Sequence, residues 1–326
     1  MRWVFAVVAV FAVVGLGLAA LLIGHADLAD EQLRAQILAL RGWRAAAAGL
    51  AGAALAVAGV LVQGLFRNPL ASPSVLGATA GAALGGQVVL FAHAAMVAAL
   101  PWWVAPEVVL PLGCLVGAGL TLLVVVGIAG RSDDPITVLL AGVIVATLLA
   151  GVGALITALA LDAWQIGRAL IAFGLGGVAQ AGPAQVVMAA PLVGIGIVMA
   201  WSWAHSLDLM LSGVDEAASL GVHTVSLTRW MLVWTAVLVG AAVAVAGGVA
   251  FVGLIVPHIV RSVVGHHHRV VIPAAAVGGA AFVILADVVA RSVPGGELPL
   301  GVITALVGAP VFLLLLARAR RQGWLA

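Results

Sequence analysis

The sequence predicts an all-α membrane protein, a polytopic bundle of about ten transmembrane helices, and three observations lead to that prediction. The 326-residue chain is 64% hydrophobic and only 8% charged, whereas soluble domains carry about 25% charged residues. Its apolar runs are continuous and as long as a membrane span, as in the 22 residues from Trp3 to Gly24. Transmembrane β-strands instead alternate apolar and polar residues. Since lipid admits only helices and closed barrels, we expect helices, in a single domain over residues 1–326.

Charges, prolines and turn clusters divide the chain into ten expected spans. These are 3–24, 45–66, 75–100, 108–130, 136–161, 184–204, 227–247, 249–264, 270–290 and 299–317. The first is interpreted as a retained span rather than a secretory signal peptide, because signal cores run about 7–15 residues. The glycine-rich piece 168–183 is expected to be a re-entrant or interfacial helix.

The distribution of arginine predicts that both termini are cytoplasmic. All fourteen basic residues are Arg. Nine then fall on the inner side, namely Arg2, Arg67, Arg131, Arg229, Arg261, Arg269, Arg318, Arg320 and Arg321, and five on the outer side, namely Arg34, Arg41, Arg44, Arg168 and Arg291. This excess agrees with the positive-inside rule. The arginines are scattered and form no basic stripe, so we expect membrane lipid around the chain and no nucleic-acid partner.

Polar segments between the spans carry the functional information. Residues 63–73 contain Asn-Pro and Ser-Pro pairs, which disfavour helix before each proline and predict a rigid turn. Asp287 and Arg291 lie one helical turn apart near a span end, so we expect them to pair. A proton-relay role for Asp287 is the alternative that an intramembrane carboxylate raises.

A second polar segment, within about 206–226, predicts a short helix outside the bilayer. Ser212 is placed to cap it, with Asp215 completing an imperfect capping box. Gly221 is placed to end it. With small alanines and one protruding leucine, Leu220, such a helix suits the groove of another protein. A surface helix without a partner is the other interpretation of the same pattern.

Histidine and cysteine provide no expected metal site. Residues 266–268 are three adjacent histidines, but neighbours on a helix point about 100° apart and do not share one ion. We therefore expect a solvated loop there. The single cysteine, Cys114, excludes an intrachain disulfide and lies in an apolar run, where we expect a small core residue.

Three motifs follow one another along the chain. They are Gln-Gly-Leu-Phe-Arg-Asn-Pro-Leu-Ala at 63–71, Phe-Val-Gly-Leu-Ile-Val-Pro-His-Ile-Val-Arg at 251–261, and Glu-Leu-Pro-Leu-Gly-Val-Ile-Thr-Ala-Leu-Val-Gly-Ala-Pro at 297–310. In order and spacing they resemble the permease family of ABC importers for iron-siderophores, haem and cobalamin, over about residues 41–316. Their signature positions are Asn68, Pro69, Pro257, His258, Arg261, Pro299, Gly301 and Pro310.

The resemblance implies roles for three groups of residues. Segment 211–222 is similar to the family's coupling helix, which sits in a cleft of the cytoplasmic ATPase; its candidate residues are Ser212, Asp215, Glu216, Ala217, Ala218, Leu220 and Gly221. Arg41, Arg44 and Arg291 match arginines that pair with acidic residues of a solute-binding protein. The family has Arg-Leu-Pro-Arg where this chain has Arg-Gly-Trp-Arg at 41–44. The loop at 133–137 resembles the cytoplasmic gate, with Asp134, Pro135, Ile136 and Thr137.

The resemblance also implies a mechanism and partners. The chain has no Gly-x-x-x-x-Gly-Lys phosphate loop, so ATP and magnesium belong to a separate dimer of ATPase subunits and this chain is expected to hold no cofactor. Two copies of the chain are expected to enclose the pathway and to work by alternating access. A periplasmic or lipid-anchored solute-binding protein would deliver a ferric siderophore or haem, with cobalamin also in the family's range. The implied location is the bacterial cytoplasmic (inner) membrane.

Two other function classes make demands that the sequence can be compared with. A secondary transporter driven by an ion gradient needs intramembrane carboxylates, for which Asp287 is the only candidate. An intramembrane metalloenzyme built on His258 and the histidine run needs a second ligand such as a His four residues away, and the sequence offers none.

Overall fold

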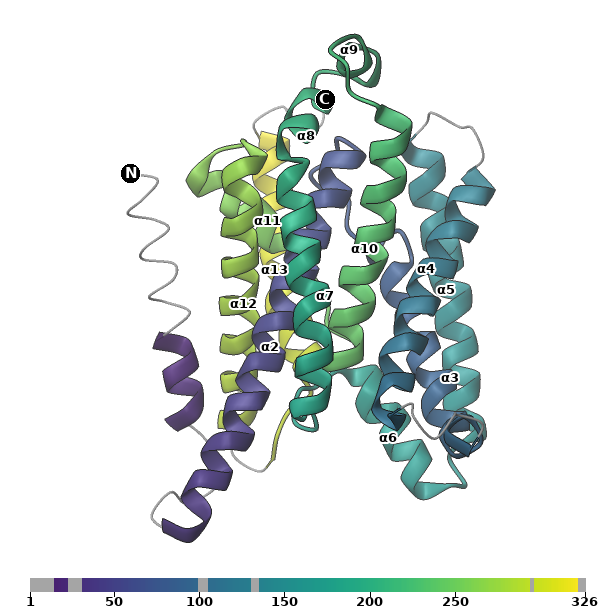
Figure 1. The fold of residues 1–326 in the computed structure, drawn as a ribbon, viewed down its shortest axis with the longest axis vertical. Coiled ribbons are helices and arrows are strands. Elements are labelled where there is room, and N and C mark those ends of the chain that lie inside the picture. The colour runs from purple at the N-terminus through teal and green to yellow at the C-terminus, as the bar shows by residue number, and fades with distance from the viewer. Residues whose placement is uncertain (1–14, 23–30, 99–104, 130–134, 294–295, 322–326) are drawn as a thin grey trace.

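The computed structural model describes residues 15–22, 31–98, 105–129, 135–293 and 296–321, and in these ranges the protein is helical throughout (Figure 1). Residues 15–22 form a short helix. The others are α2 (Glu31–Leu65), α3 (Ala78–Ala98), the 3-10 turn η1 (Pro106–Val108), α4 (Val109–Ala129), α5 (Pro135–Leu159), α6 (Trp164–Leu175), α7 (Pro183–Ser202), α8 (Ala204–Met210), α9 (Val214–Ser219), α10 (Thr224–Ala246), α11 (Val252–Val264), α12 (His268–Ser292) and α13 (Leu300–Arg321).

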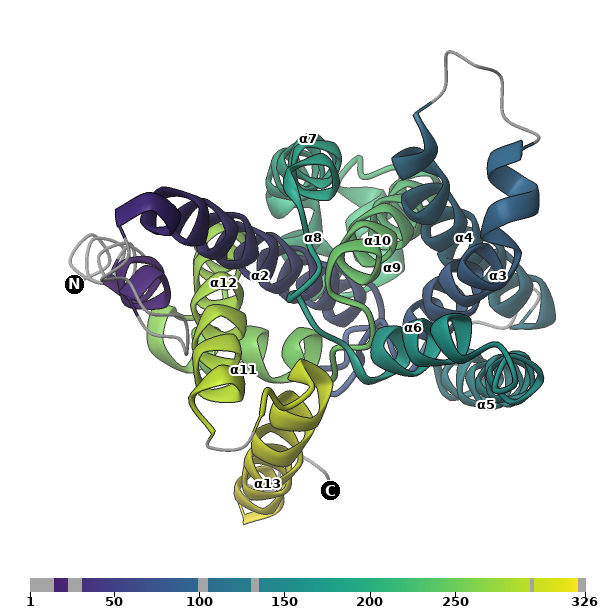
Figure 2. The ribbon, with the colours of Figure 1, turned by 90° about the horizontal axis from the view of Figure 1, so that it is seen from below.

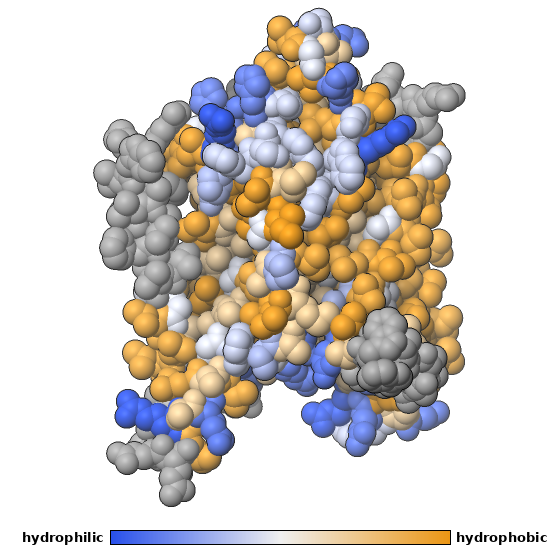
Figure 3. Space-filling model, in the orientation of Figure 1, coloured by the Kyte–Doolittle hydropathy of each residue, from blue (hydrophilic) through white to orange (hydrophobic). Residues whose placement is uncertain are grey.

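The long helices run roughly parallel to one another and give the bundle two distinct ends (Figure 1). The short helix α9 projects beyond one end, which we call the α9 end, and the short helix α6 lies at the other, the α6 end. Apolar residues form a broad band between the ends, while strongly hydrophilic residues gather at both of them (Figure 3). This is the surface that a bilayer requires of a helical bundle.

Six of the described helices are long and apolar enough to cross a membrane, and three further apolar stretches, 78–93, 252–264 and 300–314, are shorter. These nine match nine of the predicted spans. The remaining one, 3–24, lies mainly outside the described residues, so the total of ten stays a prediction. The piece 168–183 includes the second part of α6, whose 12 residues are too few to span a bilayer; that it is re-entrant or interfacial stays a prediction.

Helix α2 is the central element of the bundle (Figure 2). Its most apolar stretch is 83% buried, and it packs against α7, α10, α11 and α12. Glycines allow the closest contacts: a Cβ on Gly52 would collide with the carbonyl of Gly279 in α12, and one on Gly59 with that of Gly253 in α11. Small residues thus bring the backbones together where lipid supplies no hydrophobic force between helices.

Two helix boundaries differ from the predicted spans. Helix α2 begins at Glu31 rather than near residue 45, because Arg41 and Arg44 find partners in neighbouring segments and therefore do not end the helix. Arg41, for example, donates from Nη1 to the carbonyls of Leu21 (2.8 Å) and Leu22 (3.3 Å), at the end of helix 15–22. Helix α11 has only 13 residues, about 20 Å, and therefore begins partway through a bilayer of about 30 Å.

The predicted turn follows α2 and is closed by hydrogen bonds, while its rigidity stays a prediction. Arg67 adopts a left-handed conformation (φ 49°), and its amide bonds to Gly64 O while that of Asn68 bonds to Gln63 O, which is a Schellman closure of the helix. The Asn68 side chain then accepts the amide of Leu70 at 2.9 Å. The signature Asn-Pro pair thus fixes where the chain leaves α2.

Candidate functional site

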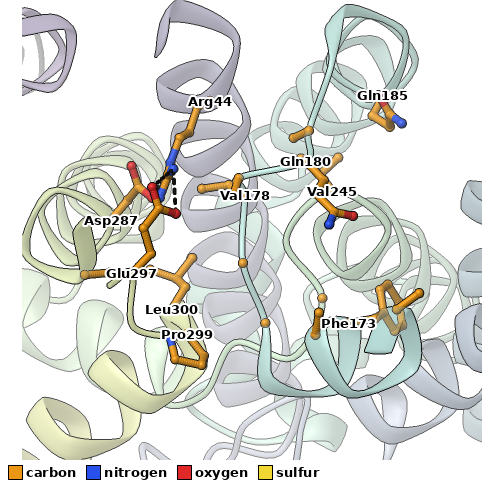
Figure 4. Close-up of a pocket in the computed structure, with 18 of the residues that line it drawn as sticks. Arg44, Phe173, Val178, Gln180, Gln185, Val245, Asp287, Glu297, Pro299 and Leu300 are labelled. Atoms are coloured by element: carbon orange, nitrogen blue, oxygen red, sulfur yellow. Dashed lines mark hydrogen bonds and ion pairs between the residues drawn. The ribbon is translucent and has the colours of Figure 1, made fainter. Parts of the chain in front are cut away.

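A chain of four alternating charges lies at the α6 end. Arg44 of α2 donates to Asp287 Oδ1 from Nε (2.9 Å) and from Nη2 (2.8 Å), and its Nη1 lies 3.0 Å from both carboxylate oxygens of Glu297. The other oxygen of Asp287 lies 3.4 Å from Arg291 Nη2. The order is Glu297, Arg44, Asp287 and Arg291, so the cluster joins α2, α12 and the connection before α13 (Figure 4).

The four members of this cluster differ in exposure. The side chains of Asp287 and Arg291 are 2% and 3% exposed, that of Arg44 is 14% exposed, and that of Glu297 is 45% exposed. Among the described residues, Oδ2 of Asp287 and two nitrogens of Arg291 have no hydrogen-bond partner, and the ion pair of 3.4 Å is the charged contact between them. Glu297 is therefore the member that a molecule outside the protein reaches first.

The connection after α6, the connection after α10 and the one before α13 meet beside the charged cluster. The Leu300 amide donates to Gly176 O (2.9 Å), just after α6, and the Gly248 amide, just after α10, donates to Phe173 O (3.1 Å). A Cβ on Gly301 would collide with the carbonyls of Gly248 and Leu175, which explains glycine at that signature position.

A cavity of about 320 Å³ opens between these breaks and the charged cluster (Figure 4). Its polar lining comprises Arg44, Gln180, Gln185, Asp287 and Glu297, and apolar residues such as Phe173, Val178, Val245 and Leu300 supply the rest. The volume falls at the low end of the range for small-molecule sites. In this conformation it admits a fragment the size of a few side chains.

The arginines predicted to dock a solute-binding protein all lie at the α6 end, as the charge distribution indicated. Their environments differ from simple outward-facing side chains. Arg41 and Arg291 are buried, and Arg44 is held by two carboxylates of its own chain. The predicted pairing of Asp287 with Arg291 is confirmed. The docking role of the three arginines stays a prediction.

The α9 end carries the predicted short helix, α9, with one error at its start. The residue preceding the helix is Gly213 (φ 145°), not Ser212, and no side chain caps it. The predicted capping box of Ser212 and Asp215 is therefore wrong. The physical reason is that the amide of Ser212 is used in the preceding turn, by Leu209 O, and the glycine makes the sharp change of direction.

The end of α9 is as predicted. Gly221 has φ 88°, its amide bonds to Ala218 O, and the Val222 amide bonds to Ala217 O, which is a complete Schellman motif. Leu220 protrudes, 66% exposed, whereas Ala217 is fully buried against the turn. The expectation that both belong to one docking face is wrong for Ala217. The exposed face also carries Leu211, Val214, Asp215, Glu216 and Ala218.

At the α9 end, Asp208 connects α8 to the start of α12. Asp208 of α8 accepts the backbone amide of His268 at 3.0 Å and faces its ring Nδ1 at 2.6 Å. His268 is the first residue of α12 and is 1% exposed. The predicted solvated loop therefore holds only for His266 and His267, which are exposed. No three His, Cys, Asp or Glu side chains gather as a metal site in the described ranges.

The structure describes most of the remaining predicted residues but not all of them. Asp134 lies outside the described residues, α5 begins at Pro135 with Ile136 next, and Thr137 is exposed; their gating role stays a prediction. Pro257 is buried in α11, His258 is half-buried, and Arg261 donates to the Gln63 side chain of α2. The carbonyl of Pro299 accepts the amides of Val302 and Ile303 in the first turn of α13, and Pro310 lies inside that helix. Cys114 is buried, as predicted.

Sequence reasoning missed three residues: Glu297 as a partner of Arg44, and Asp208 with His268. Arg44 and Asp287 are 243 positions apart, and no periodicity connects residues at that separation. Asp208 left a faint signal, as a charged residue within an otherwise apolar stretch before the coupling segment.

The fold and these two polar ends define a polytopic helical membrane transport protein, and comparison with known proteins gives its family. The chain belongs to the FecCD transport family, which it matches over residues 3–318. A solved structure described as an inward-facing, metal-chelate type ABC transporter superposes with a TM-score of 0.83 at 27% identity, covering 97% of this chain and 99% of that one.

Characterised relatives are named as permeases of importers. The cobalamin import system permease protein BtuC of Halobacterium salinarum is 38% identical over 267 residues, 81% of this chain and 69% of its own. The hemin transport system permease protein HmuU of Yersinia pestis is 35% identical over 277 residues, 83% and 80% of the two chains. The Fe(3+) dicitrate transport system permease protein FecD of Escherichia coli is 35% identical over 270 residues, 82% and 81%. The protein is thus a permease of the metal-chelate ABC importer type.

Proposed function

We propose that this chain is the membrane subunit of an ATP-driven, binding-protein-dependent importer that moves a bulky metal chelate into the cytoplasm. Two copies form the pathway, a separate ATPase dimer binds at the α9 end, and a solute-binding protein docks at the α6 end. The α9 end is then cytoplasmic, as the arginine distribution requires. Both termini lie on that side.

The observation that carries this proposal is α9 itself. It is a six-residue helix that projects beyond the long helices (Figure 1), and it and the residue after it expose apolar side chains, Val214 and Leu220. An open hollow beside it is lined by Ala218, Val222, His223, Thr224, Val225, Ser226, Arg229, Trp230 and Val233. Exposed leucine on a small, sharply closed helix is suited to insertion into a groove of a partner. Without a partner, the apolar side chain of Leu220 would stay in contact with water and would not stabilise the protein.

The energy source follows from what the chain contains. It has no lysine and no phosphate-binding loop, so nucleotide energy has to enter through another subunit. Conversely, an ion-driven transporter needs a free carboxylate within the membrane. Asp287, the one candidate named from the sequence, is neutralised by Arg44 and Arg291. This favours the ATP-driven proposal over the ion-gradient alternative.

The proposed cargo is a ferric siderophore or haem, with cobalamin as the further candidate. The relatives named above carry haem, ferric dicitrate and cobalamin. The cavity of about 320 Å³ is too small for any of these chelates as a whole. The cavity is therefore part of a larger pathway that two copies of the chain line together, rather than a closed site within one chain.

Uptake into proteoliposomes tests the proposal. The permease is reconstituted with or without its ATPase subunits, and uptake of ⁵⁵Fe-labelled siderophore, haem and cobalamin is measured with the solute-binding protein outside. We expect uptake only with ATPase, enclosed ATP and binding protein together. Uptake driven by a proton or sodium gradient in the absence of the ATPase would establish the alternative. An ATPase subunit with an inactive catalytic glutamate is the matched control.

A further inference from the structure

We infer that Glu297 is an internal substitute for the carboxylate of the docking protein, which occupies Arg44 until docking displaces it. The inference rests on the proposed function, because it concerns how the α6 end receives an acidic partner. It assigns to Glu297 the regulation of docking and of the cavity wall beside it. Glu297 is a positioning residue that acts through Arg44.

The donors of Arg44 are already committed within the chain. Nε and Nη2 are directed at Asp287, and Nη1 at both oxygens of Glu297. An incoming carboxylate therefore pairs with Arg44 only by replacing one of these two acids. A guanidinium pairs with any carboxylate in the same planar, bidentate geometry. Replacing the carboxylate of Glu297 by that of a docking protein therefore keeps the charge and the geometry around Arg44.

Exposure decides which acid is replaced. Asp287 is buried and also faces Arg291, and breaking a buried pair leaves an uncompensated charge. Glu297 is 45% exposed, and an exposed ion pair contributes little because water screens it. The carboxylate that leaves Arg44 on docking is therefore that of Glu297.

The segment that carries Glu297 forms one wall of the cavity. Glu297, Leu298, Pro299 and Leu300 all line it, opposite residues 176–181 (Figure 4). The Leu298 amide bonds to Ala290 O, and the Leu300 amide bonds to Gly176 O. Release of Glu297 removes the only ion pair that holds this segment against α2 among the described residues. Docking thus loosens the cavity wall on the side from which cargo arrives.

Affinity measurements on detergent-free nanodiscs test the exchange. The solute-binding protein that supports uptake in the proteoliposome assay is titrated onto the native chain, Glu297→Gln and Arg44→Gln. We expect Glu297→Gln to tighten binding about two- to fivefold, the range that one exposed ion pair represents. Arg44→Gln weakens binding at least about tenfold. In the double variant Glu297→Gln has no further effect, because its partner is gone.

Glu107→Gln is the matched control. Glu107 is an exposed acid of η1 at the same end, so its substitution removes the same charge without touching Arg44. A nitroxide on Leu298→Cys gives a second readout, since Leu298 is exposed and the native Cys114 is buried. We expect the label to gain mobility on docking in the native chain, and to be equally mobile before docking in Glu297→Gln.

The outcomes separate the two proposals. If Arg44→Gln binds the protein as tightly as the native chain does, the docking role at this end fails. If Arg44→Gln weakens docking but Glu297→Gln matches Glu107→Gln in affinity and label mobility, only the exchange fails. Weaker docking in Glu297→Gln than in Glu107→Gln also overturns the exchange, because Glu297 would then support docking rather than compete with it.

Discussion

The two ends of the bundle expose different chemistry, and each kind suits the partner proposed for it. The α9 end offers apolar side chains, above all Leu220, on a helix held by a Schellman turn and steadied through the Asp208–His268 contact. The α6 end offers charge, with Glu297 outermost and Arg44 behind it. Burial of apolar area gives a strong, salt-insensitive contact, whereas exposed charges steer partners and exchange readily. The first suits a permanent subunit, and the second suits a visiting one.

The largest expected effect comes from breaking the buried part of the charged end. Asp287→Ala leaves Arg44 and Arg291 beside each other without the carboxylate between them. We expect a loss of about 3–5 kcal/mol in the free energy of unfolding, measured by tryptophan fluorescence during SDS unfolding. Asp162→Ala, an exposed acid of the same end, is the control. Equal stability of the two variants would show that Asp287 is not structurally important.

The next effect concerns the apolar end. Leu220→Asp is expected to reduce ATP-driven uptake at least about tenfold, as for a central apolar anchor of an interface, without lowering the unfolding midpoint because the side chain is exposed. Leu161→Asp serves as control, because Leu161 is also an exposed leucine (56% against 66% for Leu220) and lies at the α6 end. Ala217 is unsuitable for this test because it is buried. Full uptake in Leu220→Asp would contradict the proposed ATPase contact.

A smaller effect is expected at Asp208. Asp208→Asn keeps an acceptor for the His268 amide but removes the charge at the start of α12. Replacing a charge-assisted hydrogen bond at a helix N-terminus by a neutral one costs about 1 kcal/mol of stability, which the same unfolding assay measures. Asp215→Asn, exposed on α9, should change stability by less than half of this. Identical values for both variants would mean that the Asp208 contact contributes no stability.

The smallest effect distinguishes the two ends directly. Raising NaCl from about 0.05 to about 0.5 M shortens the Debye length from roughly 14 to roughly 4 Å. Docking of the solute-binding protein should weaken several-fold, while the affinity for the ATPase subunit changes less than about twofold. Surface plasmon resonance on nanodiscs measures both. Similar salt dependence at the two ends would remove the contrast between an apolar and an ionic contact.

The sequence predicted what local pattern determines. Hydrophobic runs placed nine helices, X-Pro pairs placed the turn after α2, and Gly221 placed the end of α9, since each depends on neighbouring residues alone. Helix α2 starts earlier than predicted, because charged residues do not mark the edge of this span. Arg41 and Arg44 instead find partners inside the bundle. Those partners lie far away in sequence. The buried environment of Ala217 and of His268 likewise depends on packing that no periodicity encodes.

Helix α12 touches both regions and thereby relates them mechanically. Its first residue donates its amide to Asp208 in α8, the helix that precedes α9, and its last two turns carry Asp287 and Arg291. Its 25 residues form a helix about 37 Å long. This helix packs closely against α2 where Gly52 meets Gly279. If the proposed partner at the α9 end tilts α12 about this contact, we expect Asp287 at the opposite end of the helix to be displaced with it.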